Sequence, residues 1–315
     1  MTADADEKNA STRPDPGTNP DPTAARRKEP LATCDVCPRH CRLAEGVTGF
    51  CRARACRDGR VVAANYGRLT SIALDPIQKK PIARWKPGST VLSVGSYGCN
   101  LHCPFCQNWQ ISQAGAADVP WRDVSPAELV SLAVGERKRE AARGRLMAGI
   151  AYTYNEPLVG WEYVRDCGRL AHEAGLCNVL VSNGCAGPRV VNELAPLLDA
   201  ANIDLKSFSP AFYGACAGAP GTLDAVRHTI ETLAATPTCH LEVTTLVVPG
   251  MNDSATQMRE LARWLRSVDP RIVLHVTRFF PRWHLTDRSA TPRETVYALA
   301  DVAREELPCV LTGNC

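Results

Sequence analysis

Short aliphatic runs alternate with longer amphipathic runs from about residue 90 to the end of the chain. The short runs have the length and β-branched content of strands, and they lie at residues 91–94, 149–154, 178–181, 202–205, 241–248 and 271–276. The amphipathic runs begin at capping residues or prolines and predict helices at 126–142, 157–174, 188–198, 222–235, 255–268 and 292–306. This alternation predicts an α/β fold with a parallel sheet, arranged as a partial barrel with its site at the carboxyl ends of the strands.

Two shorter segments precede this pattern. Residues 1–30 are rich in Pro, Asp, Thr and Ala and hold almost no large apolar side chain, which predicts a disordered tail. Residues 31–60 are rich in Cys and Arg and too poor in aliphatic residues to fold by core packing alone. We therefore expect a tail, a small Cys-rich module and a core domain over residues 61–315.

Composition narrows the class of protein. The formal net charge is only +3 over 315 residues, so nothing indicates a nucleic-acid partner. No apolar stretch approaches the length of a membrane span, and the first residues lack a basic-then-apolar signal, so a cytoplasmic location is expected. Fifteen cysteines are many for such a protein. In a reducing compartment, thiols grouped at short spacings predict soft-metal ligands.

Three cysteines follow the first strand directly, as Cys99-x3-Cys103-x2-Cys106 within the stretch GSYGCNLHCPFCQNW. Cysteine thiolates hold iron–sulfur clusters, and a four-iron cluster normally takes four of them. Three cysteines leave one iron open to an exogenous ligand, which is typical of a reactive metal site. The alternative is a zinc site completed by His102 or by a distant cysteine.

This loop, with Phe105 before the third cysteine and CQNW at residues 106–109, resembles the radical S-adenosylmethionine (SAM) superfamily. Within it, the chain is similar to the pyruvate formate-lyase activating enzyme branch, and most similar to the AmmeMemoRadiSam system radical SAM enzymes. The resemblance runs from about residue 34 to residue 314. It implies a partial (β/α)6 barrel and a [4Fe-4S] cluster on the three cysteines, chelated by SAM. It further implies reductive cleavage of SAM to a 5′-deoxyadenosyl radical that abstracts hydrogen, an oxidoreductase activity without a dedicated catalytic side chain, and an electron donor such as flavodoxin or ferredoxin.

Polar residues at later strand ends are the candidates for SAM binding. They are Asn155 and Glu156 after the second strand, Ser182 and Asn183 after the third, and Asp204 and Lys206 after the fourth. An acid and a base on one face match a zwitterionic ligand, and they resemble the Asp-Leu-Lys of the activating enzymes. The alternatives are that Asp204 and Lys206 simply pair with each other, and that Asn183 is an ordinary turn residue.

The chain departs from related sequences at one position. They commonly carry a histidine where this chain has Phe280, so a histidine contact to SAM or substrate is in doubt there. His275, inside the sixth strand, is either a core residue or faces the site.

The Cys-rich module carries Cys34-x2-Cys37-x3-Cys41-x9-Cys51. Four thiolates in so small a segment predict a metal whose binding contributes to folding, either zinc or an auxiliary iron–sulfur cluster. Disulfides are the weaker alternative. The remaining cysteines are expected to be small buried apolar residues, with Cys185 near the cavity as the exception to consider.

Three hypotheses for function follow. The first is radical chemistry on a macromolecule, in the manner of glycyl-radical activation of a protein. The second is radical modification of a small molecule or peptide. The third is a non-catalytic, zinc-binding adaptor protein.

Overall fold

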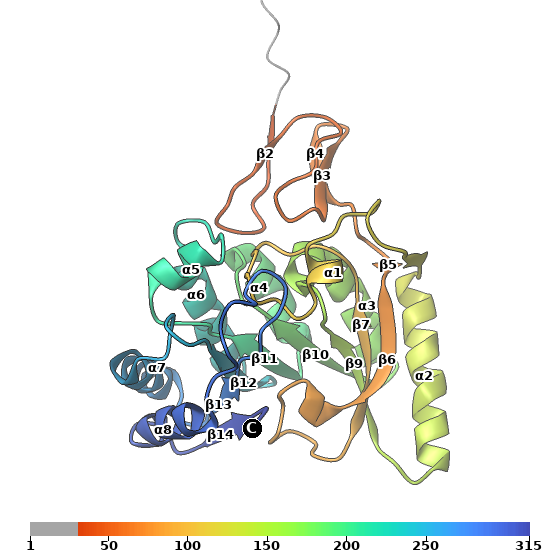
Figure 1. Ribbon diagram of the computed structural model, residues 1–315. Coiled ribbons are helices and arrows are strands. Elements are labelled where there is room, and N and C mark those ends of the chain that lie inside the picture. Colours follow the sequence, from red (N-terminus) through yellow and green to blue (C-terminus); the bar gives the residue numbers. More distant parts are fainter. Residues whose placement is uncertain (1–30) are drawn as a thin grey trace, which may run out of the picture.

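The computed structural model describes residues 31–315, so the predicted tail at 1–30 lies outside the described part of the chain. A single open sheet with the strand order β14-β13-β12-β11-β10-β9-β7-β6 forms its centre (Figure 1). Its strands are β6 Ser71–Pro76, β7 Thr90–Gly95, β9 Met147–Tyr152, β10 Cys177–Ser182, β11 Ala200–Asp204, β12 His240–Val247, β13 Val273–Arg278 and β14 Val310–Gly313. Neighbouring strands are parallel except β6, which runs antiparallel to β7. Because the edge strands β6 and β14 do not pair with each other, the fold is a partial α/β barrel.

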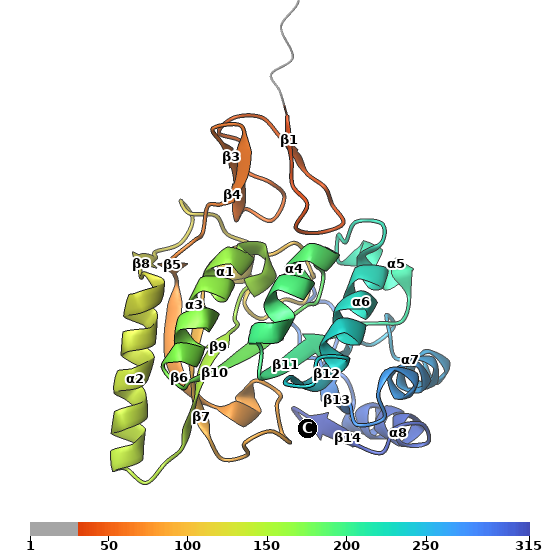
Figure 2. The same cartoon turned by 180° about the vertical axis from the view of Figure 1, so that it is seen from behind.

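Helices pack along the outer face of this sheet, as Figure 2 shows for α3, α4 and α6. The long helices are α2 Pro126–Ala142, α3 Trp161–Glu173, α4 Pro188–Leu194, α6 Thr222–Ala234, α7 Ala255–Val268 and α8 Arg293–Arg304. The shorter ones are α1 Trp109–Ser112 and α5 Pro210–Ala215, with 3-10 turns η1 Ile77–Lys79, η2 Pro157–Gly160 and η3 Ala195–Leu197. Local sequence fixes their starts: Ser125 and Glu128 form a reciprocal capping box on α2, and Ser254 caps α7.

The predicted α/β partial barrel is confirmed, and each of the six expected strands is present. Two strands of the central sheet were not predicted, β6 and β14. β6 contains Asp75 and ends in Pro76, and a proline is tolerated there because β6 is an edge strand. β14 has only four residues and ends in Gly313. The second strand stops at Tyr152, two residues earlier than expected, because Tyr154 adopts a left-handed conformation with φ 72°.

A small Cys-rich module stands over the end of the sheet near α1, α4 and α5 (Figure 1). Its strands are β1 Ala32–Thr33, β2 Arg42–Leu43, β3 Arg54–Arg57 and β4 Arg60–Ala63, paired as two antiparallel hairpins. The β3–β4 hairpin ends at Ala63 and so crosses the expected boundary after residue 60. A further short pair, β5 Arg68–Leu69 with β8 Arg122–Asp123, lies at the side of the sheet.

A buried carboxylate ties the amino-terminal end of the sheet together. Glu242 on β12 is fully buried and accepts hydrogen bonds from the backbone N–H groups of Ala83 and Arg84, at 2.8 to 3.0 Å. It also contacts the rings of His240 and His275. Although burial opposes it, these hydrogen bonds lower the pKa of Glu242 to about 2. The network joins β12, β13 and the loop after η1.

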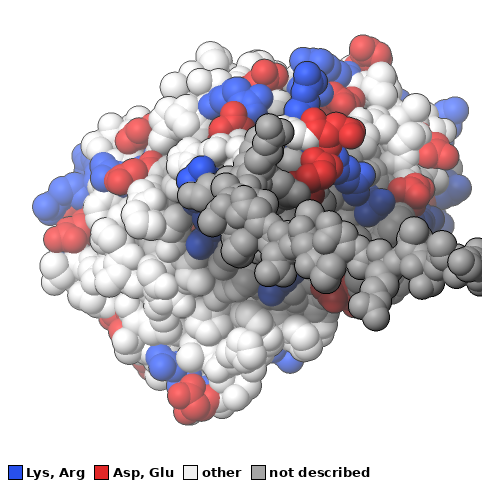
Figure 3. All heavy atoms as spheres, turned by 90° about the horizontal axis from the view of Figure 1, so that it is seen from above, with Lys and Arg blue, Asp and Glu red and all other residues white. Residues whose placement is uncertain are grey.

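Charge is not segregated on the visible surface. Lys and Arg side chains lie among Asp and Glu side chains on the face in Figure 3, which agrees with the small net charge. Over residues 31–315, no helix combines the length and the apolar character that crossing a membrane requires.

Candidate active site

The three loop cysteines line one cavity at the carboxyl ends of the central strands. Its volume is about 280 Å³, and Cys99, Cys103 and Cys106 all contribute to its wall. The six residues expected to bind SAM line the same cavity: Asn155, Glu156, Ser182, Asn183, Asp204 and Lys206. Residues from four separate strand ends are therefore gathered around a single space, as the rule for parallel sheets predicts.

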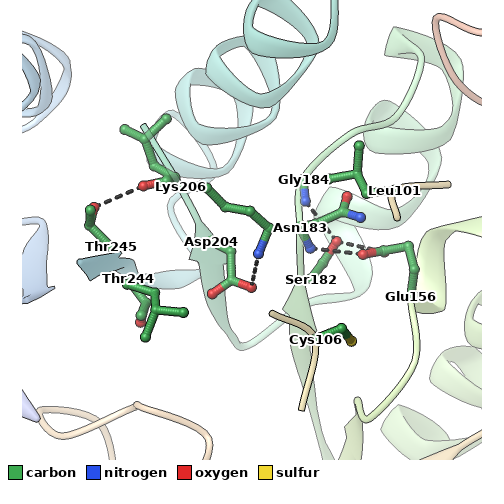
Figure 4. A network of polar contacts seen from close by, with 12 residues as sticks. Leu101, Cys106, Glu156, Ser182, Asn183, Gly184, Asp204, Lys206, Thr244 and Thr245 are labelled. Carbon is green, nitrogen blue, oxygen red and sulfur yellow. Dashed lines mark hydrogen bonds and ion pairs between the residues drawn. The ribbon is translucent and has the colours of Figure 1, made fainter. Parts of the chain in front are cut away.

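Glu156 is the most deeply held of these residues, with 2% of its surface exposed. One carboxylate oxygen accepts hydrogen bonds from Leu158 N at 2.9 Å and from Ser182 Oγ at 2.7 Å, and the other accepts from Asn183 N at 2.8 Å. Figure 4 shows the bonds to Ser182 and Asn183. Burial raises the pKa of Glu156 to about 7, although these hydrogen bonds oppose it. Burial removes the water that would otherwise stabilise the negative charge of this carboxylate, so a cationic group beside it would be favourable.

Asn183 connects the third strand end to the cysteine loop. Its Nδ2 donates to Asn100 Oδ1 at 2.9 Å and lies 3.5 Å from Cys99 Sγ, while its Oδ1 accepts from Cys185 N at 2.8 Å. The side chain is 6% exposed. Asn183 thus makes the local hydrogen bond of a turn residue, and its amide also joins a candidate cluster ligand to the strand end that carries Ser182. Its contact with SAM stays a prediction.

Asp204 and Lys206 lie next to each other in the cavity wall, at the end of β11. Lys206 Nζ lies 2.8 Å from Asp204 Oδ2, and the lysine side chain is only 13% exposed, whereas the aspartate is 38% exposed (Figure 4). Burial alone lowers the pKa of Lys206, but the Asp204 carboxylate and the Cys103 thiolate outweigh it and raise that pKa. The two residues therefore pair with each other and also present a charge of each sign to the cavity.

Asn155 is hydrogen-bonded to the backbone that leads into the cysteine loop. Its Oδ1 accepts from Ser96 N at 2.9 Å, and its Nδ2 donates to the carbonyl oxygens of Tyr97 and Gly98, both at 3.1 Å. With these partners the amide positions the loop backbone. The predicted contact of Asn155 with SAM stays a prediction.

Tyr154, beside it, was not predicted as a site residue, although it lines the cavity. Its left-handed backbone is a strained conformation for a bulky residue, which is common at functional sites. The strain is accommodated at Gly95, where a Cβ atom would come within 2.8 Å of Tyr154 Cβ. The only sequence signal for this approach is a glycine at the end of a strand.

A second residue that the sequence left unassigned is Cys216, at the end of α5. Its thiol lies within hydrogen-bonding reach of Cys103, and this contact together with burial raises the pKa of Cys103. The backbone of Cys216 also accepts a hydrogen bond from His102 N at 2.9 Å. Nothing in the spacing of Cys216 distinguishes it from the other scattered cysteines.

Three residues whose roles the sequence left open do not line the cysteine cavity. His102 stacks on Phe50, with ring centroids 4.2 Å apart, and is absent from the cavity wall that the three cysteines line. His275 pairs with Glu242 and also lines a neighbouring, wider cavity. Phe280 is 38% exposed and lies under the Arg278 guanidinium, 4.9 Å from ring centroid to Cζ.

Comparison with known proteins decides the family. The model of the radical SAM superfamily matches residues 93–265, which include all three loop cysteines and every candidate SAM ligand. The chain belongs to the radical SAM superfamily. It is 36% identical over 283 residues to a protein of Methanocaldococcus jannaschii described as uncharacterized, covering 89% of this chain and 80% of that one.

Solved structures agree at the level of the fold. A radical SAM methyltransferase from Sphaerobacter thermophilus superposes with a TM-score of 0.54 at 18% identity, over 72% of this chain and 67% of that one. Streptococcus suis SuiB gives 0.50 at 13% identity, over 70% of this chain and 48% of that one.

Membership implies an enzyme that uses a [4Fe-4S] cluster and SAM. The residues of the cavity wall suit both groups. Its wall carries three cysteines, the number that leaves one iron of a four-iron cluster without a protein ligand. Around them stand a buried carboxylate, an exposed carboxylate and a buried ammonium, which complement the charges of an amino acid group and a sulfonium.

Proposed function

We propose that this enzyme cleaves SAM reductively at a [4Fe-4S] cluster held by Cys99, Cys103 and Cys106, and that it uses the product for hydrogen abstraction. The observation that carries the proposal is the single cavity on which these three thiols and the candidate SAM ligands all lie. When bound, the cluster supplies one electron to the sulfonium of SAM, which yields methionine and a 5′-deoxyadenosyl radical.

The chain's own residues bind and orient SAM. Glu156 presents a carboxylate to the ammonium group, and its hydrogen bonds to Ser182 and Asn183 keep its orientation fixed. Asp204 and Lys206 offer one charge of each sign to the remaining polar groups of SAM.

We further propose that the enzyme belongs to the pyruvate formate-lyase activating enzyme-like branch, near the AmmeMemoRadiSam system enzymes, and acts on a protein segment. A second cavity of about 1080 Å³ adjoins the first, sharing Gln107, Asn108 and Tyr154 with it. It lies between η1 and β14, on the open side of the partial barrel. This volume slightly exceeds the roughly 300–1,000 Å³ of small-molecule sites, which favours a larger substrate. Modification of a small molecule or free peptide is the alternative, and family membership in an enzyme superfamily disfavours the adaptor hypothesis.

The first test measures SAM cleavage. After anaerobic reconstitution with iron and sulfide, the enzyme reduced with dithionite is expected to release 5′-deoxyadenosine and methionine. Cys103→Ala removes one of three cluster ligands and should abolish the release, whereas Cys239→Ala should retain it, because Cys239 precedes β12 and does not line this cavity. Cleavage that survives in Cys103→Ala would refute the assignment.

The second test separates the substrate classes. Candidate proteins and small molecules labelled with deuterium are incubated with the enzyme and SAM, and deuterium is measured in the 5′-deoxyadenosine. Transfer from a protein but not from its free building blocks supports action on a macromolecule. Transfer from small molecules alone favours the alternative.

A further inference from the structure

Four cysteines of the Cys-rich module surround one small cavity that is separate from the active site. Cys34, Cys37 and Cys41 come from the loop between β1 and β2, and Cys51 comes from the segment before β3. The hydrogen bond from Cys34 N to Cys41 O, 2.9 Å long, closes the first loop. All four residues named from their spacing therefore share one site.

The size of this cavity distinguishes between the two kinds of metal group that four cysteines hold. The centre of a water-sized sphere can move through about 10 Å³ between these cysteines, so the space is wider than a single water molecule. A single zinc ion requires its cysteine sulfurs at about 2.3 Å, so it would leave part of this space unfilled. Over the described residues, no three Cys, His, Asp or Glu side chains are grouped as for one metal ion. The thiols are thus spread for a group wider than a single ion.

Two arginines supply the charge that such a group requires. Arg39 and Arg54 line the cavity, and the Nε atom of each is buried without a hydrogen-bond partner among residues 31–315. The Arg54 side chain is 5% exposed, and its Nη1 is held 2.7 Å from the Glu162 carboxylate. Buried N–H donors without partners are costly, and thiolate or sulfide sulfur accepts hydrogen bonds from them.

The module also touches the active-site loop directly. Cys51 O accepts a hydrogen bond of 3.2 Å from Cys99 N, so one residue of each cysteine set takes part in a single bond. Gly98 makes this approach possible, because a Cβ atom there would lie 2.4 Å from Cys51 O. Asn100 lines the module's cavity and at the same time accepts the hydrogen bond from Asn183.

We propose that Cys34, Cys37, Cys41 and Cys51 bind a second [4Fe-4S] cluster, fully ligated by the protein, in a module that contacts the active-site loop through residues 98–100. Four cysteine ligands leave no open iron, so this cluster has no position for SAM. Arg39 and Arg54 balance its charge and donate to its sulfurs.

Metal analysis of the anaerobically reconstituted full chain tests this inference. Wild-type protein should hold roughly eight iron and eight sulfide per chain, and the triple variant Cys99→Ala/Cys103→Ala/Cys106→Ala should retain roughly four of each. The variant Cys37→Ala/Cys41→Ala should hold roughly four as well. Cys56→Ser is the matched control, because Cys56 is buried in the same module but does not line the cavity, and it should keep the wild-type iron content.

Two outcomes would overturn the second cluster and leave the proposed function intact: one zinc per chain in the triple variant, or no metal in it. Iron missing from the wild-type protein would instead refute the proposed function as well. Because the triple variant leaves the module untouched, misfolding of the Cys37→Ala/Cys41→Ala variant does not obscure the result. Adjacent reduced clusters in the wild type should also broaden each other's EPR signals, and the triple variant should show a single unbroadened signal.

Discussion

Replacing Gly98 by alanine tests the contact between the module and the active-site loop. Gly98 has φ 91°, and an added Cβ would come within 2.4 Å of Cys51 O and 2.8 Å of Ala53 Cβ. Two penalties therefore add. A left-handed conformation costs an alanine roughly 1–2 kcal/mol, and overpacking against backbone costs roughly 1–3 kcal/mol more.

Gly59 provides the matched control. It has φ 70°, lies in the turn of the β3–β4 hairpin, and has open space where its Cβ would stand. Gly59→Ala thus carries the backbone penalty alone, whereas Gly98→Ala carries both. The difference between the two variants isolates the cost of separating the module from the loop.

Thermal unfolding and iron content measure the outcome. At about 2–4 °C per kcal/mol for a chain of this size, Gly59→Ala should lower the melting temperature by a few degrees and Gly98→Ala by at least twice as much. Gly98→Ala should also bind less iron, because Cys99 is its neighbour and is hydrogen-bonded to Cys51. Equal losses of melting temperature, with full iron content in both variants, would refute the reasoning.

Two further substitutions test the charged groups. Lys206→Met removes the ammonium that pairs with Asp204, and since a charge-assisted hydrogen bond contributes roughly 1.5–3 kcal/mol, the Kd for SAM should rise about tenfold or more in equilibrium dialysis. An unchanged Kd would place Lys206 outside the SAM contacts. Glu242→Gln tests the buried carboxylate, whose pKa of about 2 against an ordinary 4.5 corresponds to about 3 kcal/mol of stability. That stability is present above about pH 4.5 and is lost as the pH falls toward 2. At neutral pH the variant should therefore be less stable than wild type. The difference in unfolding free energy between the two proteins should shrink as the pH is lowered from 4.5 to 2. A difference that is constant with pH, measured by denaturant unfolding, would contradict the assigned role.

The sequence predicts those elements whose ends are set by residues close by in the chain. Ser125 and Ser254 are capping residues in front of amphipathic runs, and the helices begin after them. The edge strands escaped prediction because tertiary pairing decides them: Asp75 within β6 and Gly313 at the end of β14 give little strand signal, and only the neighbours β7 and β13 make them strands.

In the candidate site, too, some features follow from the local sequence and others only from tertiary contacts. Position after a strand was enough to gather Glu156, Asn183 and Asp204 around one cavity, because the ends of parallel strands meet at one edge. The positions of Cys216 and Tyr154 depend on how α5 and the second strand end fold back, and no spacing in the chain records this. Contacts between loops far apart in sequence are therefore visible only in the structure.

Three loops of the core each receive a contact from the Cys-rich module. Cys51 O accepts from Cys99 N, Val36 O accepts from Gly187 N at 2.8 Å, and Arg39 donates to Ala217 O beside Cys216. The first loop carries the cluster ligands, the second follows Asn183, and the third places a thiol against Cys103. So small a module has little apolar surface to bury, and we infer that its own order depends on the cluster proposed at its cysteines. On this proposal, binding at the module is coupled to the geometry of the active site through these contacts.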